Sequence, residues 1–171
     1  MKITPRQSVI GAIDLVAGTP IGERLVNVLK SYAPYILSLG RFVIGLLLFA
    51  HGVAKYFGFP PSPMANVPFA SLFGAAGILE LIGGSLLMVG LFTRPTAVVL
   101  SGMTAIAYFY VHFPKSAFPI LNGGEAAILF CFSLLYLAVA GGGAWSADQW
   151  LLGEDASSGE MTVGRQTFAR L

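Results

Sequence analysis

Four long apolar stretches follow one another through the middle of the chain. They cover about residues 37–54, 72–92, 96–111 and 124–142. A helix needs roughly 20 residues to cross a bilayer, with a range of about 17–25. The third stretch is short by this measure, but the aromatic residues at 108–112 would extend it into the interface. No strand-like alternation is visible. The pattern predicts an all-α membrane protein built as a four-transmembrane-helix bundle.

A shorter segment with one apolar face precedes these stretches. Thr19 and Pro20 are typical of a helix start, with Thr19 as N-cap and Pro20 at the first helical position. The apolar residues on one face of the helix that would follow are Ile21, Leu25, Val28, Leu29 and Tyr32. The sequence therefore predicts an N-terminal amphipathic helix lying on the membrane surface. An ordinary flexible tail is the alternative.

The connectors and the basic residues predict the organisation of the chain. A very short turn at residues 93–95 makes the second and third helices antiparallel neighbours. The N-terminus, this turn and the C-terminal tail together carry more Lys and Arg residues than the connectors on the opposite side of the membrane. This predicts that both termini are cytoplasmic. We expect an N-terminal cytoplasmic or interfacial segment at 1–34, a membrane domain at 35–150 and a polar C-terminal tail at 151–171.

Composition supports a lipid environment and excludes some functions. Hydrophobic residues make up 56% of the chain and charged residues 11%, against about 25% charged residues in soluble domains. A soluble fold this apolar could not cover its own surface. The net charge of +2 and the absence of a basic cluster argue against nucleic acid as a partner. The one cysteine cannot form an internal disulfide or a CxxC pair.

The charged and polar residues of the apolar stretches sort into two groups by helical phase and depth. Charged side chains inside membranes are costly and usually face the bundle interior or a cavity. At about 100° and 1.5 Å per residue, an outer cluster is predicted to contain His51, Lys55, Glu80, His112 and Glu125. A second group near the cytoplasmic helix ends is predicted to contain Arg41, Arg94 and Asp148.

Glu80 and His51 are the first candidates for a functional role. A membrane carboxylate beside an imidazole can relay protons or bind the head of a quinone. A structural ion pair of Glu80 with Lys55 or Arg41, or a protonated carboxyl bonded to a neighbouring helix, explains Glu80 equally well. The candidate ligand-binding residues beside them are Lys55, His112, Glu125 and Tyr108.

The remaining polar residues suggest structure rather than chemistry. Arg41, Arg94 and Asp148 are predicted to fix the bundle at its inner face. A metal or haem site is not expected, because the sequence has no HxxxH, no ExxH and no cysteine cluster.

Four segments carry a family resemblance. They run from Arg41 to Gly58, from Glu80 to Arg94, from Asn122 to Glu125 and from Gly141 to Asp148. In this order and spacing, over about residues 35–150, the chain resembles the DoxX family of small bacterial membrane proteins. The resemblance implies a four-helix, multi-pass protein of the bacterial cytoplasmic (inner) membrane. The family includes a subunit of a thiosulfate:quinone oxidoreductase, and related proteins are linked to thiol and oxidative-stress handling.

Three functions are compatible with these observations. The first is a membrane subunit of an oxidoreductase, with a quinone or other small lipophilic molecule near Glu80 and His51 and a soluble redox partner that supplies electrons. The chain shows no Rossmann loop, CxxC pair or haem motif for a complete oxidoreductase. The second is a non-catalytic scaffold or assembly factor, and the third a small carrier or lipid-binding protein. The lipid bilayer is a partner in each, and an oligomer is compatible with all three.

Overall fold

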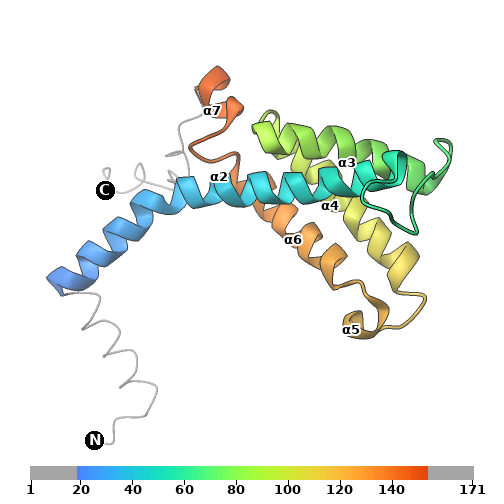
Figure 1. Cartoon of the computed structure of the whole chain (residues 1–171). Coiled ribbons are helices and arrows are strands. Elements are labelled where there is room, and N and C mark those ends of the chain that lie inside the picture. Colours follow the sequence, from blue (N-terminus) through green and yellow to red (C-terminus); the bar gives the residue numbers. More distant parts are fainter. Residues whose placement is uncertain (1–18, 154–171) are drawn as a thin grey trace, which may run out of the picture.

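The computed structural model describes residues 19–153, and every regular element among them is helical (Figure 1). The elements are α2 (Pro20–Phe57), α3 (Leu72–Val89), α4 (Thr93–Ala107), the π-helical turn η1 (Tyr108–His112), α5 (Pro119–Asn122), α6 (Glu125–Ala140) and α7 (Ala147–Leu152). The all-α prediction is confirmed, and each of the four apolar stretches overlaps one of the longer helices. Residues 1–18 and 154–171, which include much of the two predicted terminal segments, lie outside the described residues.

α2 begins where the sequence predicted and is longer than expected. The Thr19 hydroxyl accepts a hydrogen bond from Gly22 N at 3.1 Å, and Pro20 opens the helix. The helix then continues through Pro34 to Phe57, over 38 residues. The expected boundary between residues 34 and 35 therefore falls inside a helix, not between two. Figure 1 shows the N-terminal part of α2 bending away from the bundle, as an internal proline causes.

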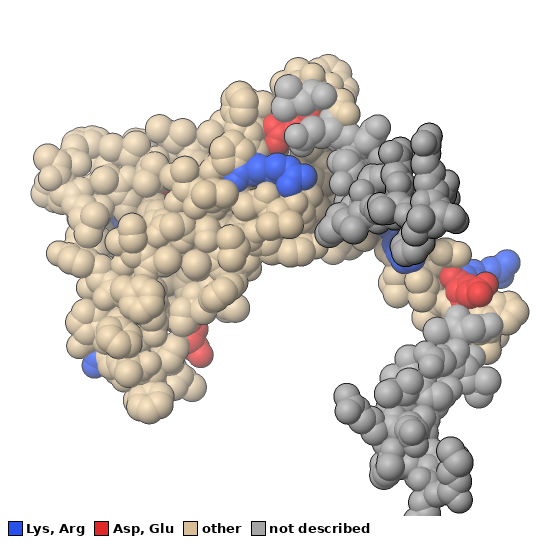
Figure 2. All heavy atoms as spheres, turned by 180° about the vertical axis from the view of Figure 1, so that it is seen from behind, with Lys and Arg blue, Asp and Glu red and all other residues tan. Residues whose placement is uncertain are grey.

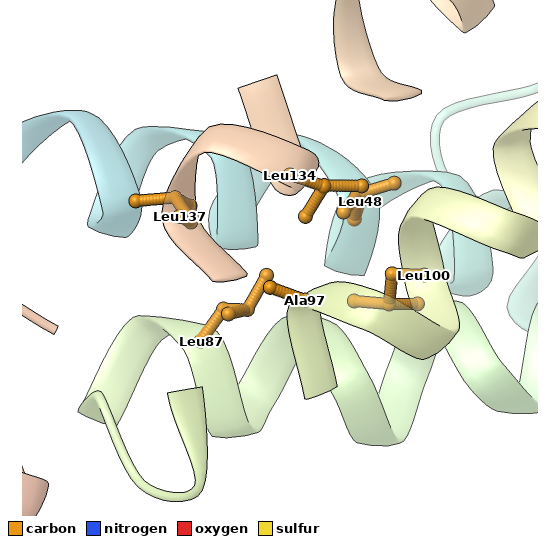
Figure 3. Packing of buried hydrophobic residues seen from close by; sticks show 6 residues of the cluster. All are labelled: Leu48, Leu87, Ala97, Leu100, Leu134 and Leu137. Carbon is orange, nitrogen blue, oxygen red and sulfur yellow. The ribbon is translucent and has the colours of Figure 1, made fainter. Parts of the chain in front are cut away.

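The four longer helices form two closely packed pairs. α2 packs most extensively against α3 and α4 against α6, and the contacts that join α3 to α4 and α2 to α6 are fewer. The buried apolar side chains at the centre come from all four helices; they are Leu48, Leu87, Ala97, Leu100, Leu134 and Leu137 (Figure 3). This small core joins the α2–α3 pair to the α4–α6 pair.

The outer surface of the bundle is apolar, as expected for helices surrounded by lipid. Many large hydrophobic side chains are exposed on every longer helix, among them Leu129 at 67% and Val139 at 75%. Charged side chains form only isolated patches on the face seen in Figure 2. Within residues 19–153, α2 and α3 are long and apolar enough to cross a membrane, while α6 is apolar but shorter. α4 has 15 residues and continues directly into η1.

Glycines bring α2 and α3 into backbone contact. A Cβ atom added to Gly45 would lie 2.8 Å from the carbonyl oxygen of Gly84, and one added to Gly84 would lie 2.7 Å from Phe49 N. About two turns further along α2, a Cβ added to Gly52 would lie 2.9 Å from Leu81 N and 3.0 Å from the Gly77 carbonyl oxygen. Small residues of this kind allow close helix approach in membranes. The contact fixes the antiparallel register in which Lys55 reaches Glu80.

We expect Gly84→Ala to destabilise the protein by about 1–3 kcal/mol, because the new methyl group would push against the backbone of α2 and neither helix can give locally. Thermal unfolding in detergent micelles measures the loss. Gly40→Ala is the matched control, since no atom lies within 4 Å of a Cβ at that α2 position. Equal melting temperatures for the two variants would contradict the close contact.

Candidate functional site

Lys55 and Glu80 form a buried ion pair between α2 and α3. The Lys55 ammonium donates to both carboxylate oxygens of Glu80 at 2.6 Å each. Both side chains are only 7% exposed. The Lys55 stem passes over Gly77, where an added Cβ would lie 3.3 Å from Lys55 Cδ. Of the partners considered for Glu80 from the sequence, the structure therefore shows Lys55, not Arg41.

His51 lies one turn before Lys55 and is exposed. Its Nδ1 lies 2.9 Å from the carbonyl oxygen of Leu47. Because a carbonyl can only accept, Nδ1 carries the proton, and Nε2 holds the lone pair when the ring is neutral. The ring packs edge-on against Phe130 of α6, with 6.0 Å between ring centres. His51 is close enough to Glu80 for their charges to interact.

His112 and Tyr108 belong to a second polar group at the π-helical turn η1. His112 Nδ1 lies 3.1 Å from the carbonyl oxygen of Asn122, and the ring of Tyr108 lies roughly parallel to that of His112 at 6.4 Å. The buried Asn122 side chain donates to the Ser116 carbonyl at 2.8 Å and accepts from Gly124 N at 2.7 Å. These bonds fold the loop before α6 back onto η1.

The outer residues therefore occupy two places, whereas one cluster was predicted. Lys55, Glu80 and His51 lie together on the α2–α3 side, while His112 and Tyr108 lie with Asn122 on the α4–α6 side. Glu125 is exposed at the start of α6. Within residues 19–153, no hydrogen bond or ion pair joins His112 or Glu125 to the Lys55–Glu80 pair. The depth estimate placed these residues at similar levels but could not show which helices pack most closely together.

Arg41 is 2% exposed and ties three segments together with its guanidinium. It donates to the carbonyl oxygens of Leu87 and of Met88, the latter at 2.9 Å, at the C-terminal end of α3. It also donates to Gly142 O at 2.8 Å and to Trp145 O at 2.6 Å. The last carbonyls of a helix lack partners within the helix and attract positive charge. Arg41 satisfies two of them in α3, those of Leu87 and Met88, and holds the loop after α6.

Asp148 and Arg94 likewise serve helix ends. The Asp148 carboxylate accepts from Phe92 N at 2.6 Å and from Thr93 N at 2.8 Å, so that it caps the N-terminus of α4 from a distant part of the chain. Arg94 donates to Ala138 O at 3.2 Å and to Val139 O, at the C-terminal end of α6. Each charge has the sign that the helix dipole favours at its position. These contacts give Asp148 and Arg94 a structural role at the ends of α4 and α6.

Sequence reasoning missed three participants in these contacts. Ser38 accepts a hydrogen bond from Trp145 N at 2.9 Å and is buried. Gly143, with φ of +78°, leaves no room for a Cβ beside Ser38 and the Pro34 carbonyl oxygen. Asn122 anchors the outer loop. The three consecutive glycines at 141–143 indicate a close approach of two backbone segments. Nothing in the sequence indicates which helix they approach. Within the described residues, no group of three or more His, Cys, Asp or Glu side chains is placed to hold a metal ion.

Known proteins with similar sequences bear on this arrangement of apolar helices with a few buried charges. A model of the DoxX family matches residues 36–113. A protein of Haemophilus influenzae, described as uncharacterized, is 38% identical over 128 residues, which make up 72% of this chain and 96% of that protein. No solved structure matches. The fold and the site thus define a membrane-type helical protein. The chain belongs to the DoxX family.

Proposed function

We propose that the chain is an inner-membrane subunit of a quinone-linked redox system and that it binds a quinone, or another small lipophilic molecule, at His51 beside the Lys55–Glu80 pair. The observation that carries this proposal is an ionisable side chain on an apolar helix surface. His51 is exposed on α2, and its Nε2 makes no hydrogen bond within residues 19–153. A ring nitrogen left without a hydrogen bond in a lipid-facing region is costly, and a bound ligand would supply the missing bond.

The chemistry of these groups fits a quinone head. The neutral His51 ring can accept a hydrogen bond at Nε2 from a hydroquinone hydroxyl, and the protonated ring can donate one to a quinone carbonyl. The ring of Phe130, nearly perpendicular to that of His51, adds an apolar surface for a flat ring. The Glu80 carboxylate is charge-paired and buried. Its role in this proposal is to stabilise the protonated imidazole, while a soluble partner supplies the electrons.

The proposal includes a membrane arrangement. All four longer helices would cross the inner membrane, with both termini in the cytoplasm. At 1.5 Å per residue, the 38 residues of α2 extend about 57 Å, well beyond a hydrocarbon core of about 30 Å. The part before Pro34 would therefore lie in the interface. Its exposed apolar residues include Ile21 at 81% and Leu29 at 62%, and Arg24 and Lys30 are exposed on the same segment.

His51→Ala tests the ligand site. Its side chain is exposed and bonds only to its own helix, so we expect a stability change within about 0.5 kcal/mol. Quinone retained through purification, quantified by extraction and mass spectrometry, should fall several-fold. Val43→Ala is the matched control, because it truncates another exposed side chain of α2.

Two results would count against the proposal. One is an unchanged quinone content in a stable His51→Ala protein. The other is a wild-type protein that retains no quinone and binds none when reconstituted with ubiquinone or menaquinone.

A further inference from the structure

A groove runs between α3 and α4. It has a volume of about 350 Å³. Its walls come from Leu72–Leu79 on one side and from Val98–Val111 on the other, and no charged side chain lines it. The Tyr110 phenol supplies its one hydroxyl. We call this feature the α3–α4 groove.

The groove exists because α3 and α4 diverge from the tight turn that joins them. The two helices are neighbours in sequence but make few contacts with each other, and Figure 1 shows them separating away from the turn. Small residues, including Ala76 and Gly102, line the space between them. No atom lies within 4 Å of a Cβ placed at Gly102. The space at this position could hold a side chain, but residue 102 is a glycine and has none.

The surroundings indicate that the occupant is hydrocarbon. The rims of the groove are exposed apolar side chains, with Val98 at 57% and Ile106 at 60%. Such rims face lipid tails when the helices span a bilayer. Apolar side chains along such a groove gain dispersion contacts when a hydrocarbon chain lies against them.

The lining of the groove suits a flexible alkyl chain. Binding pockets for small ligands start at about 300 Å³, and the groove reaches this size. An alkyl chain lying in it would contact the apolar side chains of both α3 and α4.

The end of the groove at η1 offers partners for a lipid headgroup. Tyr110, 62% exposed, lies at this end, and tyrosines are enriched at the level of headgroups. Lys115 is exposed just beyond η1, and its backbone N–H donates to the His112 carbonyl at 3.0 Å. Exposed lysines next to a membrane attract anionic lipid. A phosphate beside Lys115 and an acyl chain in the groove would match both features.

We propose that the α3–α4 groove binds an acyl chain of an anionic phospholipid whose phosphate lies at Lys115. This site is separate from the redox function proposed above and does not depend on it. It is lined by residues other than His51, Lys55 and Glu80. The bound lipid completes the packing between the two helix pairs where protein contacts are few.

Photolabelling in vesicles tests the site. The full chain is reconstituted in phosphatidylcholine vesicles with a small fraction of phosphatidylglycerol that carries a diazirine on one acyl chain. After irradiation, labelled peptides are mapped by mass spectrometry. We expect labels on the groove walls, and a several-fold lower yield there in Gly102→Leu, whose side chain would fill the floor. Gly40→Leu is the matched control, because that glycine also has open space around it but lies on α2.

A second variant tests the contact with the headgroup. Lys115→Gln should lower labelling of the groove by the phosphatidylglycerol probe and leave labelling by a diazirine phosphatidylcholine probe unchanged. Equal groove labelling in wild type and Gly102→Leu would overturn the proposal. So would cross-links between two copies of the chain through α3 and α4 in place of lipid labels. A Gly102→Leu protein that loses bound quinone while its lipid labelling persists would assign the groove to an isoprenoid tail and overturn the acyl-chain assignment.

Discussion

Lys55→Met should destabilise the protein by about 3–5 kcal/mol, because it leaves the Glu80 carboxylate buried without its partner. Both oxygens of that carboxylate are bonded to Lys55 at 2.6 Å, and the side chain is 7% exposed. The loss is measured by thermal or denaturant unfolding in detergent. Lys115→Met removes the same charge from an exposed position and should change stability by no more than about 0.5 kcal/mol.

The double variant Lys55→Met/Glu80→Leu separates structure from function. Replacing both members of a buried ion pair by apolar residues is often neutral or even stabilising, so we expect most of the stability to return. If the pair supports the ligand site, quinone retention stays low in this stable protein. If retention returns with stability, the pair is structural alone. A double variant as unstable as Lys55→Met would show that the ion pair itself is not the source of the loss.

Arg41→Met is the second change for which a large effect is expected, again about 3–5 kcal/mol. Hydrogen bonds to a charged group contribute about 1.5–3 kcal/mol each, and this variant loses bonds to four carbonyl groups. Part of the loss is offset because the guanidinium no longer has to be buried. Unfolding in detergent measures the effect, and limited proteolysis of the Gly141–Ser146 loop should accelerate, because the loop loses its bonds from Arg41.

Arg94→Met provides the comparison for Arg41. It removes the same group from the same kind of position, the C-terminal carbonyls of a helix, but from an exposed side chain. Its cost should be about 0.3–1 kcal/mol. Arg41→Lys should recover only part of the stability, because one ammonium cannot reproduce a planar fork of donors. Similar losses for Arg41→Met and Arg94→Met would contradict the importance of burial.

Helix positions were predictable because apolar runs and helix signals are local properties. Thr19–Pro20 marked the start of α2 correctly, whereas the turn expected at 93–95 lies at 90–92 and residues 93–95 already belong to α4. The continuity of α2 through Pro34 was missed, because a proline inside an apolar pattern is as often a helix boundary as a kink. The short helix α7 was missed for want of a longer apolar run.

The site was predicted only in part, since it depends on how helices pair. Helical phase placed Lys55 and Glu80 correctly on faces that can meet, and the glycines on those faces explained the close approach. The same reasoning joined His112 and Glu125 to them, because depth along a helix says nothing about which helices are partners. Arg41, Arg94 and Asp148 all bond to backbone groups at helix ends or in loops, which sequence patterns do not reveal.

The bonds of Arg41 also bear on how the protein is made. Gly142, one of its acceptors, lies 101 residues further along the chain. At about 5–20 residues per second, a ribosome needs roughly 5–20 s to reach it. During that time α2 already carries a guanidinium whose acceptors on the last loop do not yet exist. The nascent chain must therefore keep Arg41 hydrated or otherwise satisfied while three helices are added. A chain that stops short of residue 142 ends its synthesis in that state.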